Sequence, residues 1–330
     1  MKNYLLILSI CFASIGLAQK PLVVATASIF ADMAKQLGDT LIDVETIVPI
    51  GGDPHSYDPV PSDLTLINQA DVVLKNGLTF EKWMDKLIDN SGSSAEVVLI
   101  TTGITPITSQ TYAGSPDPHA WMDAENGLIY ADNIYKTLLK LLPDQEQELT
   151  ARFQAYQQKI KDTHTTILNL IQEIPDSHRI LITSHDAFQY FGQKYGLRLE
   201  SVLGTSTEAE AQTRDVEALV QVIRENPVPA VFVESTVNPK MLQQIAADNQ
   251  IVIGGSLYSD SIGDEYSEAP TYLDMLLHNC RTISNALSKT KIQESAEYPT
   301  SGESPLAKML VFIGAGFLIV IGLFVSKRFG

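Results

Sequence analysis

The segment from Asp144 to Ile174 reads DQEQELTARFQAYQQKIKDTHTTILNLIQEI and contains neither proline nor glycine. Pro143 and Pro175 bound it, and the pattern between them predicts one uninterrupted helix. At 1.5 Å per residue, roughly 30 residues span about 45 Å, which is more than a helix within one small domain usually needs. Because this helix falls midway along the chain, we expect a rigid link between two domains. A long surface helix of a single domain is the alternative.

On both sides of this helix, short apolar runs alternate with helical patterns. Such alternation predicts parallel sheets flanked by helices. The expected helices include Phe80 to Asp89 and Ala187 to Tyr195. The expected strands are Pro21 to Thr26, Val44 to Val48, Val72 to Leu74, Glu96 to Thr101, Arg179 to Thr183, Leu199 to Leu203, Ala230 to Glu234 and Ile251 to Ile253. We therefore predict an α/β protein with an N-terminal lobe (19–142), a linking helix (143–175) and a C-terminal lobe (176–290).

The two ends of the chain have the composition of export and membrane segments. Residues 1–18 combine an early lysine, an apolar run and small residues before a cleavage position after Ala18, which is typical of a signal peptide. Cys11 follows bulky Ile10, which argues against a lipid attachment there. Residues 291–305 lack periodicity and are expected to form a flexible spacer. Residues 306–326 are nearly all apolar and approach the length of a spanning helix, followed by a basic tail at 327–330 that is expected to lie in the cytoplasm. The alternative for 306–326, a buried core helix, is disfavoured because the run has no polar face.

The charge and the cysteines exclude some classes of protein. Residues 19–305 hold 39 acidic and 19 basic residues, a net charge of −20. A nucleic-acid partner is therefore not expected. Cys280 is the only cysteine after residue 18, so an internal disulfide cannot form. We expect an exported monomer.

Three of the six histidines lie in settings that suggest metal-ligand loops. His55 and His119 each end an Asp-Pro-His tripeptide, and His185 follows a predicted strand. Proline fixes its own backbone and favours an extended residue before it, so each tripeptide forms a rigid turn that ends in a potential ligand. Imidazole is the commonest protein ligand for metals. Any one of these histidines could be a surface or capping residue, but the three together favour a metal site.

The positions of these histidines place the predicted site between the lobes. Each lies beyond the carboxyl end of a predicted strand or in the loop that follows, where open α/β sheets bind ligands. Two come from the first half and one from the second, so a fourth ligand should come from the second half. Asp260, in the loop after Ile251 to Ile253, is the preferred candidate, and Glu234 is the weaker one.

Five segments in order resemble the zinc/manganese class of solute-binding proteins of ABC transporters, the metal-binding cluster A-I family. The resemblance covers about residues 20 to 290. Its segments are Val48 to Pro59, Asn76 to Trp83, Asp117 to Asp123, Ser184 to Leu197, and Val231 to Ser235 together with the Asp260 loop.

The resemblance implies two α/β lobes joined by one long helix, with metal ligands at His55, His119, His185 and Asp260. It also implies delivery of the metal to an ABC permease of the cytoplasmic membrane. Histidine at the third position occurs in zinc binders and in some members that take zinc and manganese. The chain departs from the family pattern in three respects: residues 102–118 lack the histidine-rich loop of many zinc-specific members, there is no disulfide, and the expected anchor is C-terminal.

The donor set agrees with this function. Three neutral imidazoles and one carboxylate suit tetrahedral Zn²⁺, whereas Mn²⁺ prefers more oxygen. A closed set of four ligands argues against catalysis, because catalytic zinc keeps a position for water. We expect a metal-uptake protein rather than an enzyme, with zinc as the preferred cargo and manganese as the alternative. The alternatives are a metal-dependent adhesin on the same fold and a secreted zinc hydrolase, which lacks support because no His-Glu-x-x-His motif is present. A serine hydrolase built on Ser184, His185 and Asp186 is weaker still, because triad members are usually distant in sequence.

Overall fold

The computed structural model describes residues 20–108, 114–207 and 211–289. These residues belong to one compact unit that extends to Thr290. The predicted signal peptide, spacer, membrane segment and tail lie outside the described residues. In the part of the chain that the structure describes, no helix combines the length and apolar character needed to cross a membrane.

The first sheet contains four parallel strands in the order β2-β1-β3-β4. The strands are β1 (Leu22–Ala25), β2 (Asp43–Thr46), β3 (Val72–Lys75) and β4 (Glu96–Leu99). The central strands β1 and β3 are almost wholly buried, because helices cover both faces of the sheet. We use "first lobe" for this sheet, the loops after its strands, and helices α1 (Ser28–Gly38), α2 (Pro61–Gln69), α3 (Met84–Ser91) and α4 (Ala124–Leu141).

The second group of strands consists of two parallel pairs, β5-β6 and β7-β8, in which β5 lies beside β7. The strands are β5 (Ile180–Thr183), β6 (Arg198–Ser201), β7 (Ala230–Glu234) and β8 (Val252–Leu257). The register of β7 and β8 shifts between Val231 and Phe232. We use "second lobe" for these strands, the loops after them, and helices α6 (Gln189–Tyr195), α7 (Thr213–Glu225), α8 (Lys240–Asp248) and α9 (Tyr272–Leu287).

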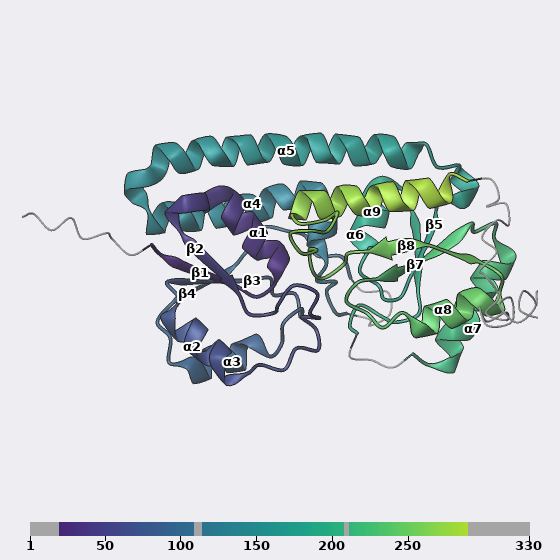
Figure 1. Ribbon diagram of the computed structural model, residues 1–330, viewed down its shortest axis with the longest axis horizontal. Helices are drawn as coiled ribbons and strands as arrows, with labels where there is room; N and C mark the ends of the chain where they lie inside the picture. The colour runs from purple at the N-terminus through teal and green to yellow at the C-terminus, as the bar shows by residue number, and fades with distance from the viewer. Residues whose placement is uncertain (1–19, 109–113, 208–210, 290–330) are drawn as a thin grey trace, which may run out of the picture. The chain divides into compact units, whose positions relative to one another are not determined.

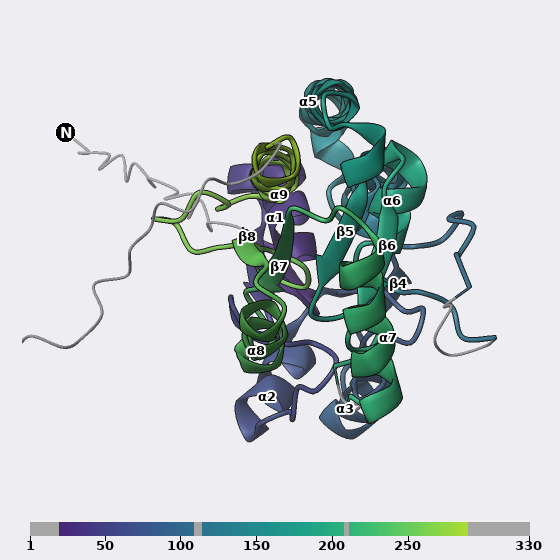
Figure 2. The ribbon, with the colours of Figure 1, turned by 90° about the vertical axis from the view of Figure 1, so that its right-hand side faces the viewer.

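Helix α5 (Glu146–Gln172) has 27 residues and extends along both lobes (Figure 1). Its buried residues recur three and four positions apart, so one stripe faces the core. They are Leu149, Phe153, Tyr156, Ile160, Thr163, Ile167 and Ile171. The end-on view in Figure 2 shows α5 on the same side as α1 and α9, with α7 and α8 on the opposite side of the strands. The predicted fold class and long helix are confirmed, whereas the domain boundaries remain a prediction.

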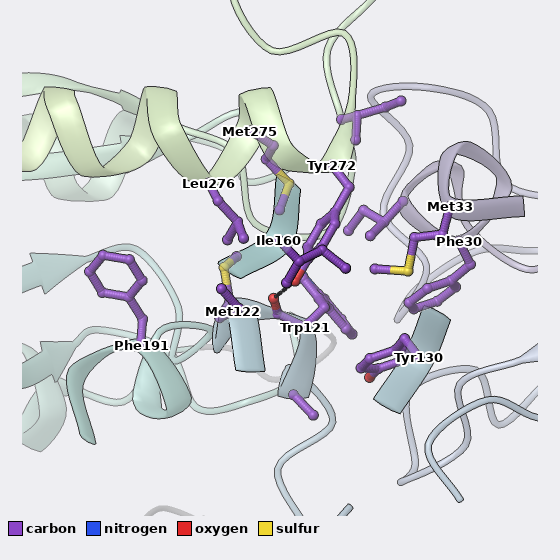
Figure 3. Close-up of a cluster of buried hydrophobic side chains, with 14 of the residues drawn as sticks. Phe30, Met33, Trp121, Met122, Tyr130, Ile160, Phe191, Tyr272, Met275 and Leu276 are labelled. Atoms are coloured by element: carbon purple, nitrogen blue, oxygen red, sulfur yellow. Dashed lines mark hydrogen bonds between the residues drawn. The ribbon is translucent and has the colours of Figure 1, made fainter. Parts of the chain in front are cut away.

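One hydrophobic core continues through the centre of the molecule (Figure 3). Phe30 stacks on Tyr130 with ring centroids 5.6 Å apart and meets the edge of Trp121 at 5.5 Å. The Tyr272 hydroxyl, at the start of α9, donates to the Trp121 carbonyl at 2.6 Å. The two lobes are therefore joined by packed side chains beneath the predicted site as well as by α5.

The two shorter helices named from the sequence both start later than predicted: α6 by two residues, at Gln189, and α3 by four. The helix expected from Phe80 begins at Met84, because residues 78–83 form turns. The Glu81 carboxylate is buried and accepts hydrogen bonds from the backbone N–H groups of Asn76 and Gly77 and from the Thr26 hydroxyl. These bonds hold Glu81 against the end of β3, and the helix can begin only after it.

Candidate metal centre

The two Asp-Pro-His tripeptides fold in the same way. The Asp53 carboxylate accepts the backbone N–H of His55 at 2.9 Å, and the Asp117 carboxylate accepts the N–H of His119 at the same distance. Each aspartate thus closes a turn on the histidine two residues later. The repeated tripeptide is therefore a repeated way of fixing the backbone of a potential ligand.

All four predicted ligands converge beyond the carboxyl ends of strands. His55 follows β2, His119 precedes α4, His185 follows β5 and Asp260 follows β8. One potential ligand atom from each of them lies within 4.8 Å of the others. All four residues are buried, with His55 the most exposed at 6%.

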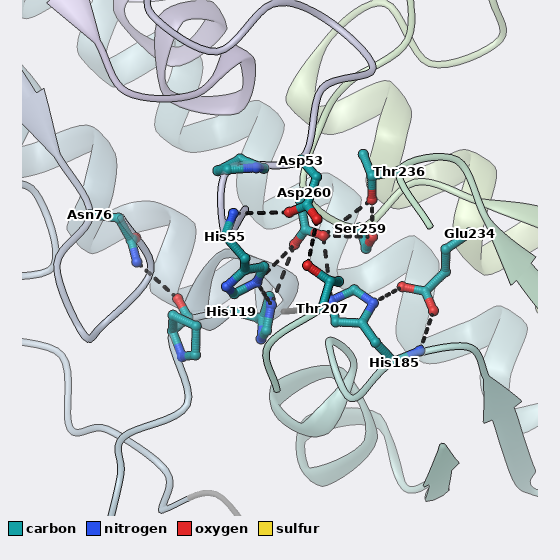
Figure 4. A network of polar contacts seen from close by, with 12 residues as sticks. Asp53, His55, Asn76, His119, His185, Thr207, Glu234, Thr236, Ser259 and Asp260 are labelled. Carbon is teal, nitrogen blue, oxygen red and sulfur yellow. Dashed lines mark hydrogen bonds and ion pairs between the residues drawn. The ribbon is translucent and has the colours of Figure 1, made fainter. Parts of the chain in front are cut away.

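The Nε2 atoms of the three histidines face the Asp260 carboxylate (Figure 4). Asp260 Oδ1 lies 3.4 Å from His119 Nε2 and 3.9 Å from His55 Nε2, and Asp260 Oδ2 lies 3.4 Å from His185 Nε2. His55 Nε2 and His119 Nε2 are 3.1 Å apart. Asp260 Oδ1 and His185 Nε2 are buried and make no hydrogen bond to any described residue. Buried polar atoms in proteins are normally satisfied, so these atoms point to a bound cation at their centre.

Two of the three histidines have a carboxylate behind the ring. Asp117 Oδ1 lies 2.8 Å from His119 Nδ1, and Glu234 Oε2 lies 2.6 Å from His185 Nδ1. Glu234 Oε1 also accepts the backbone N–H of His185 at 2.8 Å. Such carboxylates fix the tautomer so that Nε2 faces the metal, and they raise the basicity of the ligand. Glu234, the weaker ligand candidate from the sequence, is thus placed behind His185 rather than among the four converging groups.

The surroundings lower the pKa of one histidine of the site and raise the pKa values of the other two. Burial lowers the pKa of His55 to about 3, and the opposing charge of Asp260 does not offset it. For His119, burial alone would lower the pKa, but Asp117 and Asp260 together raise it to about 10. For His185, burial acts in the same direction, and Glu234 and Asp260 raise the pKa to about 9. Burial would raise the pKa of Asp260, yet the neighbouring His185 and His119 hold it well below its usual range.

Two hydroxyl groups that no sequence pattern singled out orient the carboxylate. Thr236 Oγ1 and Ser259 Oγ each donate to Asp260 Oδ2 at 3.2 Å. Ser259 directly precedes Asp260 in the chain, and only the fold brings Thr236, after β7, beside the loop that follows β8. These bonds leave Asp260 Oδ1 directed toward His55 and His119.

The other three histidines lie away from this cluster. His164, on α5, lies 3.2 Å from the Tyr195 hydroxyl, and His178 Nδ1 lies 2.9 Å from the Leu287 carbonyl. His278 is paired with Glu268 at 3.1 Å. None of the three belongs to a cluster of potential metal ligands within the described residues.

Comparisons with known proteins agree with this architecture. Residues 23–286 match the family model described as "Zinc-uptake complex component A periplasmic". The chain is 34% identical over 275 residues to the metal ABC transporter substrate-binding lipoprotein SsaB of Streptococcus sanguinis, covering 81% of this chain and 89% of that protein. It is 34% identical over 267 residues to the manganese-binding lipoprotein MntA of Halalkalibacterium halodurans, covering 81% and 88%. The solved structure of the periplasmic zinc-binding protein TroA of Treponema pallidum superposes with a TM-score of 0.78 at 33% identity, covering 82% of this chain and all of that one.

Proposed function

The chain belongs to the zinc-uptake component A family of metal-binding proteins of ABC transporters, and from this premise we propose that it carries one divalent metal ion, preferably Zn²⁺. The proposed ligands are His55, His119, His185 and Asp260. Its membership in this family of solute-binding components makes it a metal-binding transport protein and not an enzyme. One observation carries the proposal: four buried side chains from both lobes converge within 4.8 Å.

The preference for zinc rests on the donor atoms. Three imidazole nitrogens and one carboxylate match the four-coordinate sites that Zn²⁺ occupies. Mn²⁺ favours oxygen ligands and a higher coordination number, for which this set offers only the Asp260 carboxylate. The relatives do not decide the matter, because TroA is named for zinc, whereas MntA and the PsaA proteins are named for manganese.

The partner that we propose is the permease of a metal ABC transporter. Relatives with this function are named as substrate-binding lipoproteins of such transporters, which favours transport over the adhesin alternative. The body would act outside the cytoplasmic membrane, after removal of residues 1–18.

We further propose that residues 306–326 hold the body at the membrane. The support is the uncharged run from Met309 to Val325 followed by Lys327 and Arg328, which favours a tail on the cytoplasmic side. The relatives named above are lipoproteins, so this would be a different attachment. Removal of 306–330 should release the protein from membranes without changing metal binding. If alkaline carbonate strips the full-length chain from membranes, the segment does not span them.

The proposed cargo is tested by titration of residues 19–305, which contain all the described residues, with Zn²⁺ and Mn²⁺. We expect one ion per chain, bound more tightly as Zn²⁺. Single alanine substitutions at the four proposed ligands should each weaken binding, and alanine at His164 should not. Two tightly held ions, or none after zinc loading, would refute the proposal.

A further inference from the structure

The four proposed ligands are enclosed by the protein. Three of them have no exposed surface, and His55 is exposed by only 6%. A hydrated ion cannot reach such a site unless part of the wall moves. The part of the boundary between the lobes that is held by the fewest contacts should open most easily.

A pocket of about 530 Å³ lies next to the proposed site on the second lobe. Its lining includes Ser184, next to His185 in the chain, and Thr236, which donates to Asp260. Among the described lining residues, Asp53 is the one that comes from the first lobe. A divalent ion with six waters needs on the order of 180 Å³, at about 30 Å³ per water, so the pocket has room for it.

The inner wall of this pocket carries a hydroxyl with no bonding role in the described fold. Ser184 is among the lining residues, and its Oγ is buried and has no hydrogen-bond partner among the described residues. Its neighbour in sequence, His185, is a proposed ligand. A hydroxyl oxygen here can replace one water of an ion that loses its hydration shell on the way to the histidines.

One hydrogen bond across the lobes closes this pocket. The Thr207 hydroxyl of the second lobe donates to Asp53 Oδ2 of the first lobe. The same aspartate accepts the backbone N–H of His55 (Figure 4), so the contact adjoins the proposed site directly. A separate bond, from Gly51 N–H to Ser261 Oγ at 2.8 Å, ties the loop at another point.

The boundary near α1 and α9 is held far more firmly. Ser28 Oγ lies 3.1 Å from Ser261 Oγ and accepts the N–H of Ile262 at 3.2 Å. The Trp121 indole donates to the Ser259 carbonyl at 3.0 Å from within the shared core. Opening at this side would break several bonds and expose buried aromatic surface, whereas the inter-lobe side-chain bond recorded at the pocket among the described residues is the one between Thr207 and Asp53.

We propose that the ion passes to and from the proposed site through this pocket, and that the Asp53–Thr207 hydrogen bond is the latch that closes the passage. The proposal rests on the metal-carrier function proposed above. It assigns positioning roles to Asp53 and Thr207, neither of which needs to coordinate the bound ion. Because the ion would pass the same latch in both directions, the latch controls the rates of exchange more than the equilibrium affinity.

The first test is Thr207→Val, which removes the hydroxyl and leaves the ligands and their direct partners intact. With residues 19–305 and Zn²⁺, we expect dissociation into an excess of chromophoric chelator to become on the order of tenfold faster, the effect of one lost hydrogen bond to a charged group. Association should accelerate by a similar factor, so that Kd changes by less than threefold. Thr166→Val is the matched control, because the Thr166 hydroxyl bonds only the Asp162 carbonyl within α5. Unchanged dissociation, or a weaker Kd with unchanged association, would overturn the latch.

The second test joins the two positions of the latch by a disulfide bond. The double variant Asp53→Cys with Thr207→Cys places two thiols where the side chains are now in contact, and the native Cys280 is buried. The same preparation is measured reduced and oxidised, with disulfide formation checked by mass spectrometry. We expect the oxidised form to exchange Zn²⁺ at least tenfold more slowly than the reduced form. Equal rates in the two forms would show that the ion takes another route.

These outcomes are separable from failure of the proposed function. If the chain is not a metal carrier, equilibrium titration of the unmodified protein shows no binding. If it is a carrier without this latch, titration shows one ion while the exchange rates of the variants match those of the controls.

Discussion

The substitution Glu234→Gln tests how much the carboxylate behind His185 contributes to the metal centre. Glutamine keeps the shape of the side chain and can still accept the His185 backbone N–H, a bond of 2.8 Å in the wild type. It removes the negative charge that lies 2.6 Å from His185 Nδ1. Loss of such a carboxylate typically weakens a metal site by about 10- to 100-fold, or about 1.4 to 2.8 kcal/mol.

The size of the affinity loss depends on pH in a way that identifies its cause. Burial opposes protonation of His185, but Glu234 and Asp260 raise its pKa to about 9, so at pH 7 the metal must displace a proton from the wild-type ring. Without the Glu234 charge this pKa falls, and less proton competition offsets part of the lost affinity at pH 7. The affinity gap between wild type and variant should therefore widen as the pH rises toward 9.

Calorimetry in buffers of different ionisation enthalpy measures both the Zn²⁺ affinity and the number of protons released on binding. The wild type should release about two protons per Zn²⁺ at pH 7, one from His119 and one from His185, and Glu234→Gln should release fewer. Glu268→Gln is the matched control, since Glu268 pairs with His278 at 3.1 Å outside the site. Equal affinity and equal proton release in Glu234→Gln and the wild type would refute the reasoning.

Three further outcomes are expected. His185→Glu should shift the Zn²⁺ to Mn²⁺ affinity ratio toward manganese, because it replaces a nitrogen donor by a harder oxygen. His164→Ala is the control, and an unchanged ratio in His185→Glu would count against His185 as a ligand. Zn²⁺ affinity of the wild type should rise steadily from pH 5 to 8, since protons on His119 and His185 have raised pKa values and compete throughout this range; titration calorimetry that gives one affinity at pH 5 and pH 7.5 would contradict this. Gly192→Ala should lower the free energy of unfolding by about 1–3 kcal/mol in a urea melt, because its Cβ would lie 1.7 Å from the Leu199 side chain; an unchanged midpoint would show that α6 and β6 can separate at no cost.

The sequence predicted the framework because its signals are local. Two prolines bound α5, and its pattern is uninterrupted, so the long helix could be recognised within two residues at each end. The Asp-Pro-His tripeptides predicted rigid turns without any knowledge of tertiary contacts. The position of Asp260 was predictable because ligands gather at the carboxyl ends of parallel strands.

What the sequence did not predict depends on contacts between distant segments. Nothing local distinguishes Glu234 as a partner of His185 from Glu234 as a ligand, since either role needs a carboxylate at the end of β7. The Thr236 hydroxyl and the Thr207 contact with Asp53 arise only when two loops meet. The late start of α3 has the same origin, because the buried Glu81 carboxylate bonds backbone groups at the end of β3.

The central claim, one metal ion held between the lobes by three histidines and one aspartate, is tested most directly by anomalous diffraction. Crystals of residues 19–305 loaded with Zn²⁺ would be measured on both sides of the zinc absorption edge. We expect one strong anomalous peak, within about 2.0–2.2 Å of the Nε2 atoms of His55, His119 and His185 and of an Asp260 oxygen. A peak elsewhere, or coordination by Glu234 in place of Asp260, would contradict the account.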